Sequence, residues 1–110
     1  SMEPEANHPK TQSAEDRNNW SVYLLKCADN SLYCGVTNQF EKRLIRHNLG
    51  MASKYTRSRL PVECAAVRDN LTKRDAFRLE YRVKKAPRSK KIALLENWPL
   101  PAGQGGESRS

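Results

Sequence analysis

The stretch WSVYLLKCADNSLYCGVT, residues 20–37, decides the fold. Aromatic and β-branched side chains in 20–26 and again in 32–37 are typical of two strands. The polar residues between them, 27–31, are typical of a turn. The sequence therefore predicts a β-hairpin, and the rest of the chain is expected to pack around it.

The register of this hairpin decides whether its two tyrosines meet. A two-residue turn would place Tyr23 and Tyr33 on opposite faces of the sheet. A three-residue loop at 28–30 sets Tyr23 opposite Gly35 and brings both tyrosines to one face. Asn30 tolerates the left-handed conformation that the last position of such a loop needs, so we expect this register. Gly35 then leaves an open space beside the Tyr23 ring, or else it marks a bulge.

One more strand and three helices are predicted after the hairpin. The patterns indicate a helix at 39–49, a basic loop at 50–60, a strand at 61–69, and helices at 73–86 and 88–98. Asn38 and Glu41 have the spacing of a capping box, and Gly50 is a typical stop. Thr72 is a typical cap for the next helix, which Pro87 ends. The order ββαβαα predicts an α+β domain, a three-stranded antiparallel sheet with flanking helices.

Length and charge bound the class of protein. The chain has 110 residues, which is one domain at about 100–200 residues per domain. Large apolar side chains fall almost entirely in 20–98, so we expect the folded domain there and disordered tails at 1–19 and 99–110. The net charge is +8, and 20–98 carry 17 Lys and Arg against 7 Asp and Glu. Such a basic domain points to nucleic acid, although a merely solvated basic surface is the plainer alternative.

No apolar run reaches the ~18 residues of a membrane helix, and the first 19 residues have the features of neither a secretory nor a transit peptide. The cysteines are Cys27, Cys34 and Cys64. Their odd number and the lack of C-x-x-C spacing argue against a disulfide framework and a zinc site. We expect three small buried thiols in a reducing cytoplasm.

The first helix carries polar residues where its core face should be. Phe40 and Leu44 must face the core, and at about 100° per residue Arg43 and His47 lie on or beside the same face. An arginine at the edge of a core usually binds a carboxylate or a phosphate. The alternative is an extended arginine that reaches solvent and a hydrogen-bonded histidine.

Glu80 is the corresponding anomaly in the second helix, because it is a lone acid beside the apolar stripe. One interpretation is an ion pair with Lys84, one turn later. The other is a ligand for a hard divalent cation such as Mg²⁺. Basic residues concentrate in 37–59 and 82–91, either as solvated faces or as nucleic-acid contacts. The candidate contacts are Lys54, Tyr55, Arg57, Arg59, Lys84 and Lys90.

Taken in order, these features resemble the GIY-YIG nuclease superfamily, and more narrowly its small stand-alone bacterial members, the YhbQ-like group. The resemblance runs from about Trp20 to Lys91. It rests on Ser21-Val22-Tyr23, Tyr33-Cys34-Gly35, Arg43, His47, the loop 54–62 and Glu80. Three departures stand out: Ser-Val replaces Gly-Ile, Cys34 replaces the second Ile, and 81–96 lack the Asn that many members carry beyond the Glu. Lys84 or Lys90 takes over from that Asn, or the interaction is missing.

The resemblance implies a metal-dependent phosphodiesterase. Water would attack the phosphorus in line, the 3′ oxygen would leave, and Glu80 would hold one divalent ion, Mg²⁺ or Mn²⁺. Arg43 would neutralise the phosphate. Tyr23 or Tyr33 would be the base, which requires lowering a phenol pKa from near 10. His47 would hydrogen-bond the first tyrosine or the nucleophile.

The function expected is therefore an endonuclease acting on DNA, with RNA as a second substrate class, selective for structure or for single strands. The surface offers little means of reading bases in a groove. Two alternatives are a non-catalytic nucleic-acid-binding module with this fold and a protein-interaction domain. A protein partner for targeting is also compatible with so small a chain.

Overall fold

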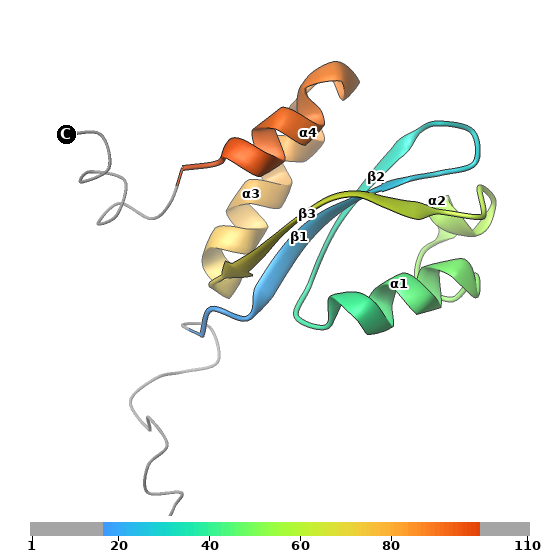
Figure 1. The fold of residues 1–110 in the computed structure, drawn as a ribbon, viewed down its shortest axis with the longest axis horizontal. Coiled ribbons are helices and arrows are strands. Elements are labelled where there is room, and N and C mark those ends of the chain that lie inside the picture. The colour runs from blue at the N-terminus through green and yellow to red at the C-terminus, as the bar shows by residue number, and fades with distance from the viewer. Residues whose placement is uncertain (1–16, 100–110) are drawn as a thin grey trace, which may run out of the picture.

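The computed structural model describes residues 17–99. Its elements are β1 (Trp20–Lys26), β2 (Leu32–Thr37), α1 (Phe40–Asn48), α2 (Lys54–Arg57), β3 (Glu63–Leu71), α3 (Lys73–Lys85) and α4 (Arg88–Asn97). The predicted α+β class is confirmed: the three strands form an antiparallel sheet in the order β2-β1-β3 with helices around it (Figure 1). Apart from positions 17–19 and 99, the predicted tails lie outside the described residues. Within 17–99 no helix has the length and apolar content that crossing a membrane would need.

The hairpin has the three-residue register. Tyr23 pairs with Gly35 and Leu25 pairs with Tyr33, so both tyrosines lie on one face of the sheet. Asn30 has a φ of 70°, the left-handed conformation that the loop requires. The prediction of an open space at Gly35 is wrong, however, because the Tyr23 ring itself lies over this glycine and fills that space.

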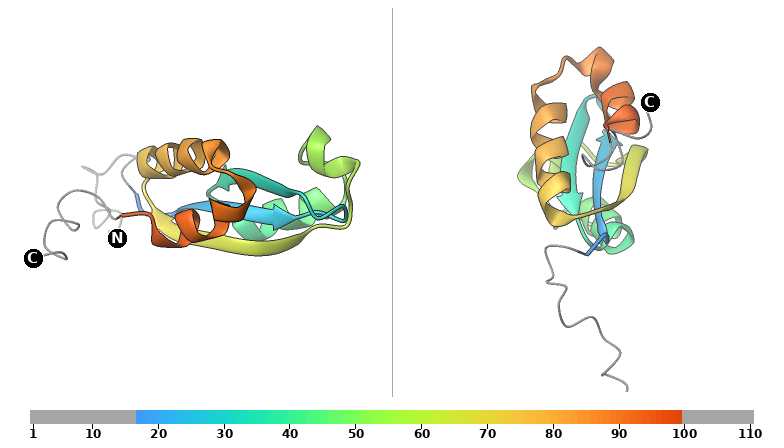
Figure 2. Two further views of the ribbon diagram at one scale, coloured as in Figure 1. Left: turned by 90° about the horizontal axis from the view of Figure 1, so that it is seen from above. Right: turned by 90° about the vertical axis from the view of Figure 1, so that its left-hand side faces the viewer.

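The sheet is covered by helices on both faces, with α3 and α4 on one side and α1 with α2 on the other (Figure 1). Alternate residues of β1 face the two sides. Val22 and Leu24 pack with buried residues of α3 and α4. Tyr23 and Leu25 belong to a second core cluster, against which Phe40 of α1 packs. Figure 2 shows that α2 lies at the end of the molecule opposite the end of α4.

The start of α1 differs from the expected capping box. Gln39 is the N-cap and its side chain makes no cap hydrogen bond. The hydroxyl of Thr37, at the end of β2, already accepts from the Gln39 N–H at 3.0 Å. Asn38 therefore lies before the N-cap and does not cap this helix. At the other end, Gly50 has a φ of 75° and its N–H bonds to the carbonyl of His47, as expected of a stop.

The region expected as a loop, 50–60, contains the short helix α2. Ser53 caps it by accepting from the Thr56 N–H at 3.1 Å. The following strand begins later than predicted, at Glu63, because the two residues before it cannot join the ladder. Pro61 has no N–H, and both polar groups of Val62 bond to the Asn48 side-chain amide, at 2.8 and 3.0 Å.

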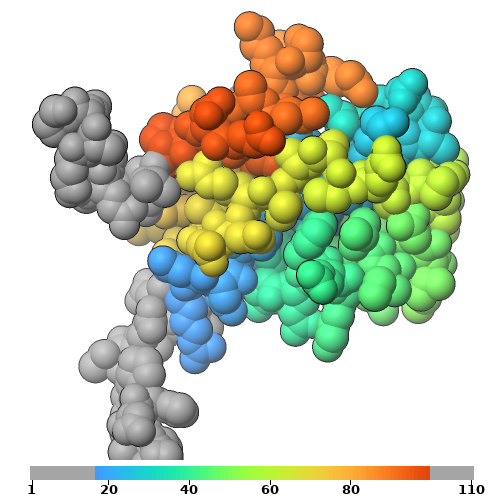
Figure 3. All heavy atoms as spheres, viewed as in Figure 1, coloured from blue at the N-terminus to red at the C-terminus, as the bar shows by residue number. Residues whose placement is uncertain are grey.

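The helical pair is held by basic side chains that bind backbone carbonyls. Arg68 of β3 donates to the carbonyls of Leu95 and Trp98, at 3.1 and 2.9 Å, at the end of α4. Lys91 of α4 donates to the carbonyl of Val83, at 2.8 Å, at the end of α3. Figure 3 shows the resulting surface, on which β3 runs across the molecule between α4 above and α1 below.

Candidate active site

A buried hydrogen bond joins Tyr23 of β1 to His47 of α1. The Tyr23 hydroxyl lies 2.9 Å from His47 Nε2, and each residue is only 1% exposed. Of the two partners expected for His47, the first tyrosine is therefore the one it contacts. The position of His47 on the inner face of α1 follows from the helical spacing of Phe40 and Leu44, which pack against the same cluster.

His47 is held from its other side by α2. Its Nδ1 lies 2.8 Å from the hydroxyl of the fully buried Thr56, and Thr56 Oγ1 lies 2.9 Å from Ser53 Oγ. When Nε2 accepts from the Tyr23 hydroxyl, Nδ1 carries the ring hydrogen and donates it to Thr56. One hydrogen-bonded chain thus runs from Tyr23 through His47 to the cap of α2.

Tyr33 completes the aromatic group on this face. Its ring meets His47 edge-on, with centroids 5.2 Å apart, and its centroid lies 6.4 Å from that of Tyr23. Tyr55 of α2 stacks on Tyr33 with centroids 5.8 Å apart and an angle of 27°. Because α2 packs here, the basic segment 54–59 lies directly beside the tyrosine pair.

Charge and burial set the protonation states at neutral pH. Burial, and secondly Tyr33, raise the pKa of Tyr23 far above its ordinary value, and the Arg43 guanidinium offsets only part of this. Burial, and secondly Arg43, lower the pKa of His47. Tyr23 is therefore a neutral phenol and His47 a neutral imidazole. Arg43 lowers the pKa of the Tyr23 phenol, but by less than burial raises it.

Position 35 must be a glycine because the Tyr23 ring occupies the space that a side chain there would fill. A Cβ at this position would lie 2.3 Å from the Tyr23 hydroxyl oxygen and 2.4 Å from Cζ. Such distances are far below van der Waals contact. The hairpin register and the glycine together allow the ring to lie flat enough over β2 for its hydroxyl to reach His47.

Glu80 lies on α3, on the other side of the sheet, and pairs with Lys84 at 3.1 Å. Its side chain is only 17% exposed, and its charge adds to the burial that raises the pKa of Cys34 in β2 to about 12. Burial alone would lower the pKa of Lys84, but Glu80 outweighs it and the pKa is raised. Within 17–99, no hydrogen bond or ion pair connects Glu80 to the Tyr23–His47 group.

The donor set fits a hard divalent ion that keeps most of its ligands as water and substrate oxygens. Across the described ranges, no three His, Cys, Asp or Glu side chains lie together as a ready-made metal cage. Glu80 offers one partly buried carboxylate. Mg²⁺ is commonly held by one or two carboxylates, with water and substrate phosphate as the other ligands, so a single glutamate is a sufficient protein contribution to such a site.

The six predicted nucleic-acid contacts fall in two places. Lys54, Tyr55 and Arg57 belong to α2 beside the tyrosines. Arg59 follows them, but its guanidinium lies over the Tyr55 ring at 3.8 Å and pairs with Asp29 at 3.0 Å. Both Tyr55 and Arg59 are thus already engaged in contacts within the protein. The remaining two, Lys84 and Lys90, belong to α3 and α4, the helices that cover the opposite face of the sheet.

Three residues of this region were missed in the sequence. Thr56 and Ser53 hold His47, and Asn48 fastens the segment before β3 to α1. Serine is a preferred N-cap residue, so Ser53 is the local signal that could have revealed the start of α2. The pairing of Asn48 with Val62 spans 14 residues, and no local pattern announces it.

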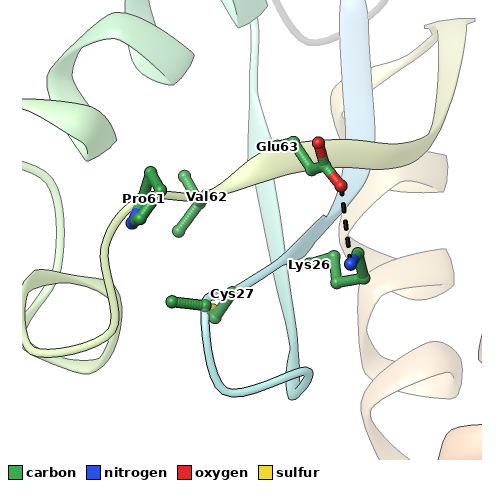
Figure 4. Close-up of a pocket in the computed structure, with 6 residues that line it drawn as sticks. Lys26, Cys27, Pro61, Val62 and Glu63 are labelled. Atoms are coloured by element: carbon green, nitrogen blue, oxygen red, sulfur yellow. Dashed lines mark ion pairs between the residues drawn. The ribbon is translucent and has the colours of Figure 1, made fainter.

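A separate pocket of about 230 Å³ lies where β1 ends and β3 begins (Figure 4). Its lining is Lys26, Cys27, Ala28, Pro61, Val62 and Glu63. The Lys26–Glu63 ion pair, at 3.5 Å, spans one side of it. None of the five predicted catalytic residues lines this pocket, so it is distinct from the Tyr23–His47 group.

Comparison with known proteins matches this chain to one family model and to several bacterial relatives. The family described as the GIY-YIG catalytic domain matches residues 19–93. The UPF0213 protein of Nitratidesulfovibrio vulgaris is 46% identical over 76 residues, 69% of this chain and 69% of that protein. The UPF0213 protein of Bacillus pumilus is 48% identical over 81 residues, 74% of this chain and 83% of that protein.

A solved structure is similar as well. The solution NMR structure of the protein EF2693 from E. faecalis has 35% sequence identity to this chain and a TM-score of 0.50. The match covers 71% of this chain and 83% of that one. The names of these relatives state no activity.

Proposed function

This chain belongs to the family of GIY-YIG catalytic domains, and from that premise we propose that it is a divalent-metal-dependent endonuclease that hydrolyses phosphodiester bonds in DNA. The proposal carries the family's nuclease activity over to this chain.

The observation that carries the proposal is the hydrogen bond between two neutral groups, the Tyr23 hydroxyl and His47 Nε2, at 2.9 Å. A neutral phenol is a poor base by itself. Bonded to a neutral imidazole, it can accept a proton from water at its oxygen while its own proton passes to Nε2. Tyr23 and His47 would thus act as one base, and Thr56 would stabilise the resulting imidazolium by accepting from Nδ1.

Arg43 and Tyr33 supply the rest of the tyrosine side of the site. The Arg43 guanidinium influences both Tyr23 and His47, so a phosphate placed before these two groups would also meet its charge. A guanidinium there would neutralise the equatorial oxygens as charge develops on them. Tyr33 remains the second candidate for the base.

Glu80 is the proposed ligand for the metal. A bound Mg²⁺ or Mn²⁺ would stabilise the negative charge that develops on the departing 3′ oxygen. Glu80 would contribute one oxygen and would have to release Lys84, whose side chain is 56% exposed and could turn to a phosphate instead. Lys84 is therefore a candidate phosphate contact in the loaded state.

The substrate is proposed to be DNA in a single-stranded or branched form. Net charge and the basic helix α2 beside the tyrosines favour a polyanion. RNA remains the second substrate class, a protein partner is a further candidate for targeting, and the cytoplasmic location expected from the cysteines stays a prediction.

The decisive experiment compares Glu80→Gln with Lys84→Met on labelled single-stranded, duplex and flap DNA, and on RNA, with Mg²⁺, Mn²⁺ or chelator. A neutral amide is a poor ligand for Mg²⁺, so the glutamine variant should lose cleavage by orders of magnitude and keep or improve binding. Lys84→Met breaks the same ion pair without removing the carboxylate. It should weaken DNA binding by the loss of one phosphate contact but still cleave bound DNA.

Wild-type cleavage by Glu80→Gln in both metals would show that Glu80 is only the ion-pair partner of Lys84. Binding without cleavage by the wild-type protein, in every metal and on every substrate, would favour the alternative function, a non-catalytic nucleic-acid-binding module. Loss of both binding and cleavage in Glu80→Gln, with a lowered unfolding midpoint, would assign Glu80 a structural role.

A further inference from the structure

Two aromatic rings stand in solvent on α3. Phe77 is 43% exposed and Tyr81, one turn later, is 61% exposed. The buried side of the helix is formed by Ala76, Leu79 and Val83. The two rings are therefore not part of the core that docks α3 onto the sheet.

Each ring lies in a positively charged setting. Phe77 packs against Trp20 with centroids 5.8 Å apart, and the Lys73 ammonium lies over the Trp20 ring at 5.5 Å. The Lys85 ammonium lies 4.9 Å from the Tyr81 centroid and donates to the Tyr81 hydroxyl at 3.2 Å. Proteins that bind single-stranded nucleic acid typically do so with a surface on which exposed aromatic rings alternate with cations.

The charge of the whole helix is complementary to a polyanion. Six cations lie on α3, namely Lys73, Arg74, Arg78, Arg82, Lys84 and Lys85. Two acids oppose them, and one of these, Glu80, is paired with Lys84 at 3.1 Å. An acidic partner or a phosphate backbone is therefore attracted to this helix, and a basic partner is repelled.

The rings lie on the same flank of α3 as the Glu80–Lys84 pair. At about 100° per residue, Phe77, Glu80, Tyr81 and Lys84 fall on one side of the helix between its buried stripe and its outermost face. A strand that follows this flank past the two rings therefore also passes Glu80.

We propose that this flank of α3 binds single-stranded DNA, with two unpaired bases stacked on Phe77 and Tyr81 and the backbone held by the surrounding cations. The inference rests on the proposed function, because it assigns the flank to the strand that is to be cut near Glu80. A duplex does not satisfy this surface, since its bases are stacked on one another and offer no free faces. Single-strand binding by aromatic stacking does not require a sequence, in agreement with the lack of a groove-reading element.

The test separates base stacking from attraction to phosphate. Binding is measured by fluorescence anisotropy in chelator, where no cleavage occurs, with an oligothymidylate and with a strand of the same length whose central nucleotides are abasic spacers. The wild-type protein should bind the base-bearing strand more tightly. Phe77→Leu with Tyr81→Leu keeps apolar bulk and all charges, and it should weaken that binding by about fivefold or more per ring while leaving the spacer strand unaffected.

Two controls accompany the double variant. Tyr81→Phe keeps the ring and removes the hydroxyl that Lys85 contacts, and it should bind like the wild type. Leu49→Ala removes an apolar side chain of α1 that is 65% exposed, and it should also leave the preference for bases intact. Thermal unfolding of all variants checks that the fold is retained.

Equal binding of the two strands by the wild type, or an unchanged preference in the double variant, would overturn the proposal. Self-association that the double variant abolishes, or tighter binding of an acidic peptide than of DNA, would assign the face to another occupant. Because the assay is run without metal, a preference for bases lost in the double variant would stand even if the protein proved unable to cut. If the protein cleaves DNA but the double variant binds both strands as the wild type does, the proposed function stands and this inference is rejected.

Discussion

Gly35→Ala tests how closely the Tyr23 ring is seated on the hairpin. A Cβ at position 35 would lie 2.4 Å from Tyr23 Cζ, where ordinary contact begins at 3.4 Å. Since the ring is buried, it must withdraw by about 1 Å against its close-packed surroundings. The same movement takes its hydroxyl out of the 2.9 Å hydrogen bond with His47.

The cost can be worked from these contacts. Overpacking a buried position lowers the free energy of unfolding by about 1–3 kcal/mol, and the lost buried hydrogen bond adds about 1–3 kcal/mol. The smaller freedom of the unfolded alanine chain offsets about 0.4–1 kcal/mol. We therefore expect Gly35→Ala to destabilise the protein by about 1–6 kcal/mol and to reduce cleavage, because the Tyr23–His47 pair is broken.

Urea unfolding followed by tryptophan fluorescence measures this cost, and Tyr23→Leu supplies the control. The leucine has no atoms where Tyr23 places Cζ and its hydroxyl, so in that background Gly35→Ala should cost little or should stabilise. The two substitutions should thus be strongly non-additive. Additive costs, or a Gly35→Ala protein as stable and active as the wild type, would show that a side chain at position 35 does not displace the Tyr23 ring.

Four further predictions address the site and its supports. Thr56→Val removes the partner of His47 Nδ1 and should lower cleavage about tenfold or more and change the pH profile of cleavage, whereas Thr56→Ser should restore both. Because the pKa of His47 is lowered in the folded protein, the unfolded chain binds its proton first as pH falls. The unfolding free energy should therefore decline below about pH 6.5 with a slope of up to about 1.4 kcal/mol per pH unit, and His47→Gln should flatten this decline in urea titrations from pH 7.5 to 5.5. Lys54→Ala with Arg57→Ala should reduce the salt dependence of DNA binding by roughly one unit of slope per lost phosphate contact, measured by anisotropy; an unchanged slope would remove α2 from the binding surface. Arg68→Met should lose the hydrogen bonds to the end of α4 and about 1–3 kcal/mol of stability, and an unchanged urea midpoint would contradict that role.

The course of the hairpin could be predicted because its determinants are local. Strand propensity marks 20–26 and 32–37, and a three-residue loop at 28–30 accommodates the left-handed Asn30, whose φ is 70°. Helical spacing placed His47 on the inner face of α1 for the same reason, since Phe40 and Leu44 share that face. Thr72 as the cap of α3 is likewise a short-range hydrogen bond, to the Asp75 N–H at 3.1 Å.

The remaining features depend on groups that are distant in the chain. The sequence alone determined that Tyr23 and Tyr33 share a face. The three-residue loop sets the hairpin register, and the side-chain period of two then fixes the face of each residue. Only the tertiary structure decided that Tyr23 bonds His47, 24 residues away, and that Thr56 holds the other side of the imidazole. Burial at that junction also decided the direction of both pKa shifts, because the cost of charging a group depends on the surroundings that packing creates.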